Sequence, residues 1–243
     1  MRRVRFRDPA GATRTGEWTD AIECDGRSYD PAAVEVLPPC EPTKVVCVGR
    51  NYVAHADERG ADVPDRPLLF LKPPNAVASH GATVTLPTGV AGNRIEHEVE
   101  LGAVVGERCR DVDPAEATGV LAGYTVMNDL SNRDDQRRET NWVRGKAFDG
   151  AAPIGPVLAT PEEVPDDATV ECRVDGEIRQ RASREQMVFS VPELVSEVSR
   201  FLTLEPGDVI ATGTPKGVGP VEDGDRLELT VEGVGTLQHT VRA

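Results

Sequence analysis

The apolar residues of this chain are gathered in short runs that end at proline or glycine. Runs of about four to eight apolar or alternating residues between such breakers are typical of β-strands. They occur at 44–48, 68–71, 83–86, 98–105, 124–127, 169–174 and 208–211. At the end of the chain, 227–231 and 237–241 predict a hairpin around the glycines at 233 and 235. The pattern therefore predicts a chain dominated by strands.

Helix signals are few. Asp113-Pro114 predicts the start of a short helix that continues through Leu121. Ser190 and Glu193 have the spacing of a capping box, and apolar residues follow at helical spacing until Gly207. Strands of irregular length with occasional helices favour a β-rich α+β fold, a sandwich or roll, over alternating βαβ units. Neither G-x-G-x-x-G nor G-x-x-x-x-G-K-[ST] occurs, which disfavours a nucleotide-binding fold.

The first part of the chain differs from the rest. Residues 1–37 are short polar stretches with turn signals and little apolar mass, and the proline-rich stretch 38–42 has the composition of a stiff linker. We therefore expect a small N-terminal β-rich appendage with its linker at 1–42 and one main domain at 43–243.

The charge balance limits the partners of this protein. There are 41 acidic and 27 basic residues, for a net charge of −14, and only four of the basic residues are lysines. A surface with this much negative charge repels nucleic acid and anionic membranes. We therefore expect neither as a partner. Acid excess together with scarce lysine favours a salt-rich, halophilic cytosol, where salt screens self-repulsion. An acidic protein from a GC-rich genome is the alternative.

The compartment is predicted from what the sequence lacks. No apolar run approaches the roughly 20 residues that span a bilayer, and the basic start has no apolar secretory stretch. The five cysteines are scattered, odd in number and without a C-x-x-C pair, which argues against a disulfide framework or a thiolate zinc site. We expect a soluble protein of the cytoplasm.

Three carboxylates form the first candidate site. On a strand, Glu98 and Glu100 share one face, and the strand continues into an apolar core where unpaired carboxylates are costly. Asp129 follows the apolar strand 124–127 and is a candidate third carboxylate. Three carboxylates without thiolates favour Mg²⁺ or Mn²⁺ over Zn²⁺. Two alternatives remain when these residues are considered separately. Glu98 and Glu100 also fit a solvent-exposed strand face, and Asp129 also fits a turn or a helix cap.

Other polar groups resist an explanation by packing. His55 and Glu58 are neighbours on a helical turn, where the carboxylate can orient the imidazole as a general base for water. Lys146 is one of the four lysines. The glycine-rich stretch 213–219 follows a strand and can bring backbone close to an anionic ligand. Exposed polar residues and a tight turn are the alternatives.

The order of the motifs carries more information than any one of them. G-R-N-Y-x-x-H-x-x-E is followed by L-F-L-K-P-P, E-x-E-L, N-D-L-S-x-R-D, R-G-K-x-F-D and G-T-P-x-G-V-G. From about residue 43 to the end, the chain resembles the fumarylacetoacetate hydrolase family, most of all its short members that act on acylpyruvates and oxaloacetate. The resemblance implies a mixed β-sandwich roll, a homodimer, and bound Mg²⁺ or Mn²⁺.

The resemblance also implies roles for individual residues. Its motif positions make Glu98, Glu100 and Asp129 metal ligands, and His55 with Glu58 the pair that activates water. Lys146 would face the substrate oxygens. Three further matches would bind the substrate carboxylate, namely Arg50, Arg133 and Thr214. Asn132 stands where relatives commonly carry alanine, which is expected to alter the pocket wall.

These residues suit small dicarbonyl or 2-oxo diacid substrates whose reactions pass through an enolate. The first prediction is hydrolysis of a C–C bond in acylpyruvate-type 2,4-dioxo acids, with pyruvate enolate as the leaving group. The alternatives are an oxaloacetate decarboxylase or tautomerase, and an isomerase of the 2-hydroxyhepta-2,4-diene-1,7-dioate type. A non-catalytic protein on the same fold is a third possibility, although every implied ligand carboxylate and Lys146 are present.

Overall fold

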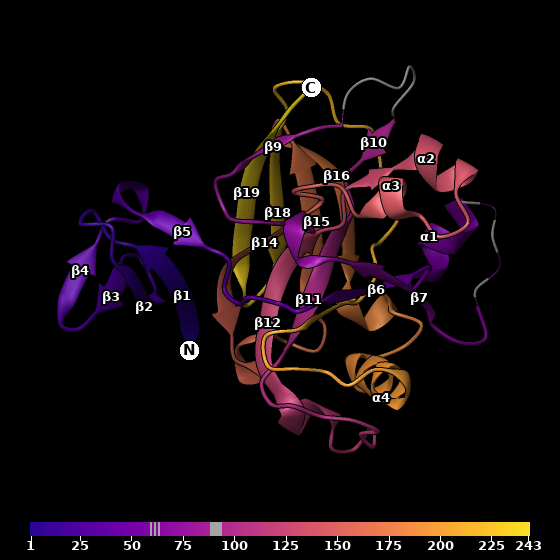
Figure 1. Ribbon diagram of the computed structural model, residues 1–243, viewed down its shortest axis with the longest axis horizontal. Helices are drawn as coiled ribbons and strands as arrows, with labels where there is room; N and C mark the ends of the chain where they lie inside the picture. The colour runs from indigo at the N-terminus through magenta and orange to yellow at the C-terminus, as the bar shows by residue number, and fades with distance from the viewer. Residues whose placement is uncertain (59, 61, 63, 88–93) are drawn as a thin grey trace.

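The computed structural model describes residues 1–58, 60, 62, 64–87 and 94–243, and two sheets form most of it (Figure 1). The main path of the 12-stranded sheet runs β4-β3-β2-β1-β14-β12-β11-β17-β6-β7, with β5 beside β1 and β8 beside β14. Its strands are β1 (Arg2–Arg7), β2 (Thr13–Trp18), β3 (Ile22–Cys24), β4 (Arg27–Tyr29), β5 (Glu35–Leu37), β6 (Val45–Gly49), β7 (Leu68–Lys72), β8 (Val77–Ala78), β11 (Val99–Val105), β12 (Leu121–Asn128), β14 (Ala152–Ala159) and β17 (Val209–Ala211).

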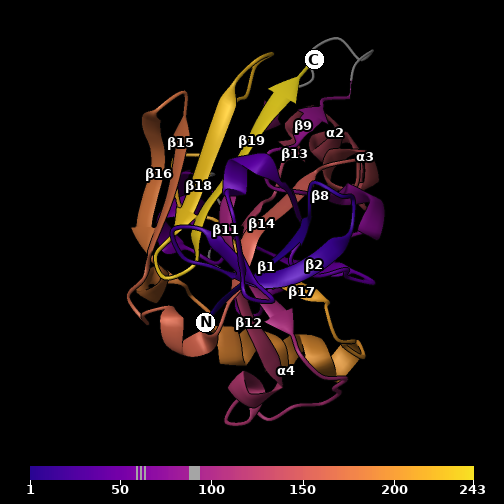
Figure 2. The same ribbon diagram turned by 90° about the vertical axis from the view of Figure 1, so that its left-hand side faces the viewer.

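A second sheet of five strands packs against the centre of the first. Its order is β16-β15-β18-β19-β9, from the strands β9 (Thr83–Thr85), β15 (Thr169–Val174), β16 (Glu177–Ser183), β18 (Arg226–Val231) and β19 (Gly235–Arg242). Figure 2 shows this sheet beside β11, β12 and β14. Buried residues of both sheets, such as Leu101, Val126, Leu229 and Leu237, belong to one apolar core. Burial of this surface drives the two sheets together.

The helices are short and lie at the margins of the sheets (Figure 1). They are α1 (Val53–Glu58), α2 (Arg133–Arg138), α3 (Val143–Lys146) and α4 (Val191–Phe201). Single 3₁₀ turns occur at Pro31–Ala33, Pro74–Ala76, Ala117–Val120, Pro161–Glu163 and Arg184–Gln186. A third, two-stranded sheet joins β10 (Ile95–Glu96) to β13 (Ser131–Asn132). The predicted β-rich α+β class is confirmed. In the described part of the chain, no helix combines the length and the apolar character needed to cross a bilayer.

The predicted helix after Asp113 is wrong. Asp113 does cap a turn, because its Oδ1 accepts the Ala115 N–H at 2.9 Å. The segment then forms only the 3₁₀ turn Ala117–Val120, and Leu121 begins β12 opposite Val105. A helix of this length forms too few hydrogen bonds to offset the free-energy cost of nucleation. From Leu121 onward the chain instead forms hydrogen bonds with the neighbouring strand β11.

The predicted helix after Ser190 is confirmed as α4. The Glu193 carboxylate accepts the N–H and the hydroxyl of Ser190, each at 2.7 Å, which fixes the first turn. Leu194, Val195 and Val198 face the core. Phe201 has the spacing of a core residue but does not face the core. It lies at the end of the helix, is 56% exposed, and packs beneath the Arg66 guanidinium.

Residues 1–42 contain β1 to β5, which lie to one side of the molecule in Figure 1. β1 pairs with β14 through Arg2 and Arg3, opposite Ala159 and Leu158. This pairing extends the large sheet into the first part of the chain. The division of the chain at residues 42 and 43 into two domains stays a prediction.

Candidate functional site

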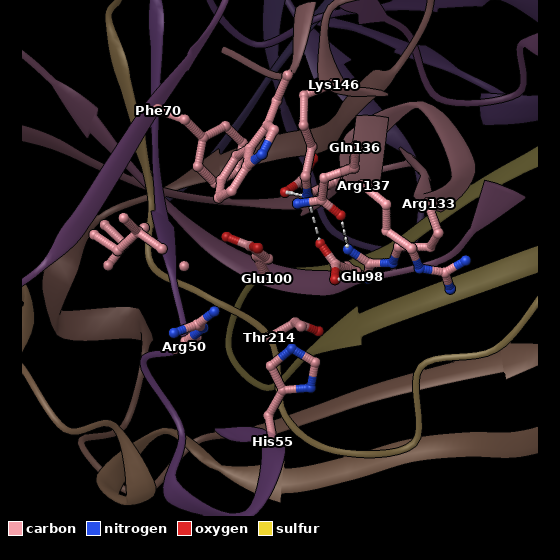
Figure 3. A pocket seen from close by; sticks show the side chains of 15 residues that line it. Arg50, His55, Phe70, Glu98, Glu100, Arg133, Gln136, Arg137, Lys146 and Thr214 are labelled. Carbon is pink, nitrogen blue, oxygen red and sulfur yellow. Dashed lines mark hydrogen bonds and ion pairs between the residues drawn. The ribbon is translucent and has the colours of Figure 1, made fainter. Parts of the chain in front are cut away.

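A cavity of about 230 Å³ opens beside the ends of β6, β7, β11 and β12 (Figure 3). Eight of the nine residues that the sequence nominates line it. They are Arg50, His55, Glu98, Glu100, Asp129, Arg133, Lys146 and Thr214. Glu58 lies behind His55 and does not line the cavity. The fold thus gathers segments from positions 50 to 214 of the chain around one space.

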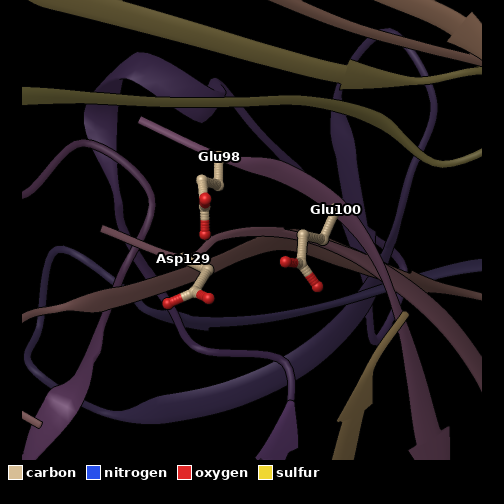
Figure 4. A group of neighbouring side chains, drawn as sticks. All are labelled: Glu98, Glu100 and Asp129. Atoms are coloured by element: carbon tan, nitrogen blue, oxygen red, sulfur yellow. The ribbon is translucent and has the colours of Figure 1, made fainter. Parts of the chain in front are cut away.

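Strand register brings the three carboxylates together. β11 and β12 run antiparallel with Val99 opposite Asn128, and the Asp129 N–H donates to the Glu98 carbonyl at 2.9 Å. Glu98, Glu100 and Asp129 are all buried, and each offers an oxygen within 4.8 Å of the others. Figure 4 shows the three carboxylates around a common space.

The charges of the triad are compensated unequally. Burial alone would raise the pKa of Glu98, but the neighbouring Arg133 and Lys146 lower this pKa well below its ordinary value. The pKa of Glu100 is raised well above its ordinary value, by burial first and then by the charges of Asp129 and Glu98. Among the described residues Glu100 has no cationic partner, and it accepts only the Gly213 N–H, at 2.7 Å.

This arrangement fits a hard divalent cation. All three donors are carboxylates, which Mg²⁺ and Mn²⁺ prefer, and the excess negative charge is concentrated at Glu100. A cation bound there would remove the repulsion that raises the pKa of Glu100.

Two buried lysines hold the triad from one side. Lys146, at the end of α3, donates to Glu98 at 2.8 Å, and to Asp129 and Ser131 at 2.5 Å each. Burial lowers the pKa of Lys146, but the charges of Asp129 and Glu98 outweigh it and raise the pKa overall. The ammonium also lies 4.7 Å from the centre of the Phe70 ring.

Lys72 is a site residue that the L-F-L-K-P-P motif contains but to which the sequence analysis gave no role. It ends β7, is fully buried, and lies 2.8 Å from Asp129 Oδ1. Its ammonium also donates to the carbonyls of Leu130, Lys146 and Ala151 at 2.6–3.1 Å. Burial is the main cause that lowers its pKa, against the charge of Asp129. Two signals were available in the sequence: the lysine is part of that motif, and it directly follows an apolar run in a chain with only four lysines.

Asn128 fixes the backbone next to the triad. Its side-chain oxygen accepts the Glu98 N–H at 2.9 Å, and its amide nitrogen donates to His239 Nε2 at 2.9 Å. Burial lowers the pKa of His239 to about 4, so the ring is neutral and accepts this hydrogen bond at neutral pH. The amide therefore links Glu98, which directly precedes β11, to β19 of the small sheet.

His55 enters the cavity from α1, as the helical spacing predicts. The ring is buried, and its Nδ1 lies 3.4 Å from Glu58 Oε2, a long contact. Figure 3 shows the ring beside Thr214, on the side of the cavity away from Lys146. The Gly217 N–H donates to both oxygens of Glu58, at 3.1 and 3.2 Å, and so holds this carboxylate behind the imidazole.

The glycine-rich loop is used differently from the expectation. Its backbone N–H groups at Gly213 and Gly217 donate to the protein's own carboxylates, Glu100 and Glu58. Both glycines have positive φ, +96° and +97°. A Cβ at Gly217 would lie 2.1 Å from the Arg179 carbonyl oxygen, so only glycine allows this approach.

The two candidate arginines differ in their partners. Arg133 is engaged by Glu98, by Glu96 at 2.7 Å and by Gln136 at 2.8 Å. Arg50 is exposed, has no ion pair in the described ranges, and adopts the left-handed region with φ +59°. A non-glycine residue there carries backbone strain, a feature common at functional sites.

Further residues complete the wall. Gln136 and Arg137 on α2 line the cavity together with Trp142. Gln136 follows Arg133 by three residues, a helical spacing that could have identified it. Asn132 does not line the cavity: it caps α2, and its amide donates to the Asp135 carboxylate at 2.9 Å.

Known proteins with this sequence pattern share the fold. Residues 44–242 match the family model described as fumarylacetoacetate (FAA) hydrolase C-terminal. The oxaloacetate tautomerase YisK of Bacillus subtilis is 36% identical, over 96% of this chain and 82% of its own.

Two solved structures extend the comparison. A 5-carboxymethyl-2-hydroxymuconate delta-isomerase from Mycobacterium smegmatis is 40% identical and superposes with a TM-score of 0.89, over 100% of this chain and 98% of its own. A fumarylpyruvate hydrolase from Pseudomonas aeruginosa, solved with Mn²⁺ and pyruvate, is 39% identical. It has a TM-score of 0.78 and covers 86% of this chain and 91% of its own. Because the family model spans most of the sequence and the fold matches throughout, this chain belongs to the fumarylacetoacetate hydrolase family.

Proposed function

We propose that this protein is a divalent-metal-dependent enzyme that hydrolyses a C–C bond in acylpyruvate-type 2,4-dioxo acids. One observation carries the proposal: His55, backed by Glu58, faces the carboxylate triad and Lys146 across one small cavity. A water molecule activated by the imidazole would therefore lie in the same cavity as the substrate carbonyl that it attacks.

The protein's own groups divide the work. His55 takes a proton from water, and Glu58 stabilises the imidazolium that forms. The hydroxide adds to the distal carbonyl, and the C–C bond then breaks with its electron pair left on pyruvate as the enolate. The positive charge of Lys146, which lies beside Glu98 and Asp129, stabilises the developing enolate. The imidazolium returns its proton to the enolate carbon, so acylpyruvate and water give a carboxylic acid and pyruvate.

The metal, Mg²⁺ or Mn²⁺, would be held by Glu98, Glu100 and Asp129. When bound, it supplies a chelation point for the carboxylate and keto oxygens and a Lewis acid for the enolate. Arg50 and Thr214 line the same cavity and are proposed to bind the substrate carboxylate, together with Arg133.

A second candidate reaction moves protons without attack by water. The names of the Bacillus and Mycobacterium relatives, an oxaloacetate tautomerase and a delta-isomerase, favour it. Oxaloacetate tautomerisation or decarboxylation, and isomerisation of 2-hydroxyhepta-2,4-diene-1,7-dioate, all need the same enolate. His55 would then transfer a proton between substrate atoms.

We also propose that the enzyme is a homodimer of the cytoplasm that acts on a small 2-oxo acid. The five free cysteines support a reducing compartment. The net charge of −14 supports a small-molecule substrate over nucleic acid or membrane.

The first test is pyruvate release from acetylpyruvate, with Mg²⁺ and molar KCl, against a chelator-treated sample. Metal-dependent pyruvate supports the hydrolase. If the enol absorbance decays faster than the blank without pyruvate release, the second candidate replaces it. If neither changes with metal, the proposal is wrong.

His55→Ala tests the assigned base. Loss of a general base lowers the rate by about 10²- to 10⁴-fold, while Mn²⁺ still binds because the three carboxylates remain. His80→Ala is the matched control, because His80 contacts Trp18 and lies outside the residues that line the cavity. Full hydrolysis by His55→Ala would show that water is activated elsewhere.

A further inference from the structure

Gln180 reaches the cavity wall from the opposite sheet. It lies on β16, the edge strand of the five-stranded sheet, and is 1% exposed. Its amide nitrogen lies 2.7 Å from Thr214 Oγ1 and 2.7 Å from the Pro215 carbonyl oxygen. Its amide oxygen lies 3.1 Å from the Val99 nitrogen and 3.0 Å from His97 Nδ1. The side chain therefore joins the strand of the carboxylates to the loop that carries Thr214.

The hydrogen bonds distinguish the oxygen of the Gln180 side-chain amide from its nitrogen. A backbone N–H can only donate, so the atom that faces the Val99 N–H must be the amide oxygen. Both hydrogens of the amide nitrogen are then donated, one to Thr214 and one to Pro215. His97 consequently carries its proton on Nδ1. Every polar atom of the buried Gln180 side chain has a partner.

This assignment determines what the Thr214 hydroxyl does. Its oxygen accepts the Gln180 amide hydrogen, so its own hydrogen is available for donation. Within the described ranges, the Thr214 hydroxyl has the Gln180 amide as its hydrogen-bond partner and no protein acceptor for its own hydrogen, and Thr214 lines the cavity. A hydroxyl held in this way complements an anionic oxygen inside the cavity.

We propose that Gln180 is a positioning residue that commits the Thr214 hydroxyl to donate to the carboxylate of the bound 2-oxo acid. This inference rests on the proposed function. By holding the Pro215 carbonyl as well, Gln180 sets the distance of the loop from the triad. The residue touches no substrate, and its effect on binding passes through Thr214.

The test is a double-mutant cycle read out by pyruvate binding to the Mn²⁺-loaded protein in calorimetry. In Gln180→Glu, the introduced carboxylate keeps an acceptor for the Val99 N–H but now takes the Thr214 hydrogen. We expect pyruvate affinity to fall at least about tenfold, and the same for Thr214→Val, because each removes one hydrogen bond to a charged group. The double variant should lose no more than the larger single loss.

Kinetics and controls separate positioning from general damage. KM should rise in Gln180→Glu while kcat stays within about threefold, because uniform binding is lost and the chemistry is not. Thr214→Ser, which keeps the hydroxyl, should bind nearly as well as the wild type. Gln186→Glu makes the same charge change at an exposed position and should have no effect.

The outcomes are distinguishable. Unchanged pyruvate affinity in Gln180→Glu, or losses that simply add in the double variant, would overturn the role of Gln180 and leave the proposed function intact. A wild-type protein that neither binds pyruvate nor turns over any 2-oxo acid would overturn both. If Gln180→Glu does not fold, Gln180→Met removes the donor that holds the Thr214 hydroxyl and the Pro215 carbonyl. Pyruvate affinity should then fall because the loop is no longer held in place, and an unchanged affinity would overturn the role of Gln180.

Discussion

At the scale of single residues, the site depends on buried charges that compensate one another. Lys72 and Asp129 are 0% and 1% exposed and lie 2.8 Å apart. Removing Lys72 leaves the buried carboxylates with one compensating ammonium fewer, so that Asp129 keeps only its ion pair with Lys146 among the described residues. Such a loss in the interior costs far more than an exposed ion pair contributes. The three carbonyls that Lys72 also bonds would lose their donor.

Lys72→Met should therefore lower the free energy of unfolding by about 3–5 kcal/mol. Urea unfolding in the presence of a chelator measures it. Lys216→Met is the matched control, because Lys216 is exposed and should change the midpoint little. Equal midpoints for the two variants would show that Lys72 is not needed to hold Asp129.

At the scale of elements, the contact between Asn128 on β12 and His239 on β19 makes the stability of the fold depend on pH. The pKa of His239 falls from an ordinary value of 6.5 to about 4 on folding, through burial. Between these values the unfolded chain binds a proton that the folded chain does not, so the stability of the fold decreases as pH falls from about 6.5 to about 4. The size of this loss is about 3 kcal/mol.

Replacing His239 removes this titration. His239→Gln keeps an acceptor for the Asn128 amide, and its free energy of unfolding should fall less steeply than that of the wild type between pH 7 and pH 4. Chemical unfolding at several pH values gives the difference between the two proteins. A difference that does not change with pH would contradict the assignment of a neutral, buried His239.

The elements also show what the sequence could predict. Strands such as β11 and β15 could be predicted from the sequence because glycine or proline bounds their apolar runs. β14 was not, since Pro153 and Pro156 argue against a central strand. It tolerates Pro156 where its register with β12 is irregular, between Tyr124 and Val126. Pro153 lies near the start of the strand, opposite Ala78 of the short strand β8. β16 was missed because its residues are mostly polar.

The candidate site was predictable in part. The spacing of Glu98 and Glu100 indicates one strand face, and that of His55 and Glu58 one helical turn. The contribution of Gln180 depends on packing between two sheets, which no local pattern encodes. Sequence alone also could not indicate that the backbone N–H of Gly213 serves Glu100, because this contact joins segments 113 residues apart.

At the scale of the whole molecule, the acidic surface predicts a dependence on salt. Of the four lysines, Lys72 and Lys146 are buried in the site, so the surface is left with few lysines and many carboxylates. Self-repulsion at a net charge of −14 is screened as ionic strength rises. The unfolding midpoint should rise as KCl goes from 0.1 M to molar concentrations; a flat midpoint would refute salt adaptation.

The central claim is that Glu98, Glu100 and Asp129 hold a divalent cation. Thermal unfolding of Glu100→Gln at pH 8, with and without Mn²⁺, tests it most directly. Because the pKa of Glu100 is raised on folding, the metal-free protein loses stability as the pH rises above the ordinary pKa of a glutamate carboxyl. Without metal, Glu100→Gln should therefore melt above the wild type.

With Mn²⁺, the order should reverse. Mn²⁺ should raise the Tm of the wild type and of Glu107→Gln, an exposed control with the same charge change, and leave Glu100→Gln nearly unchanged. An equal rise in Tm for Glu100→Gln and the wild type would contradict the assignment of the metal to these carboxylates.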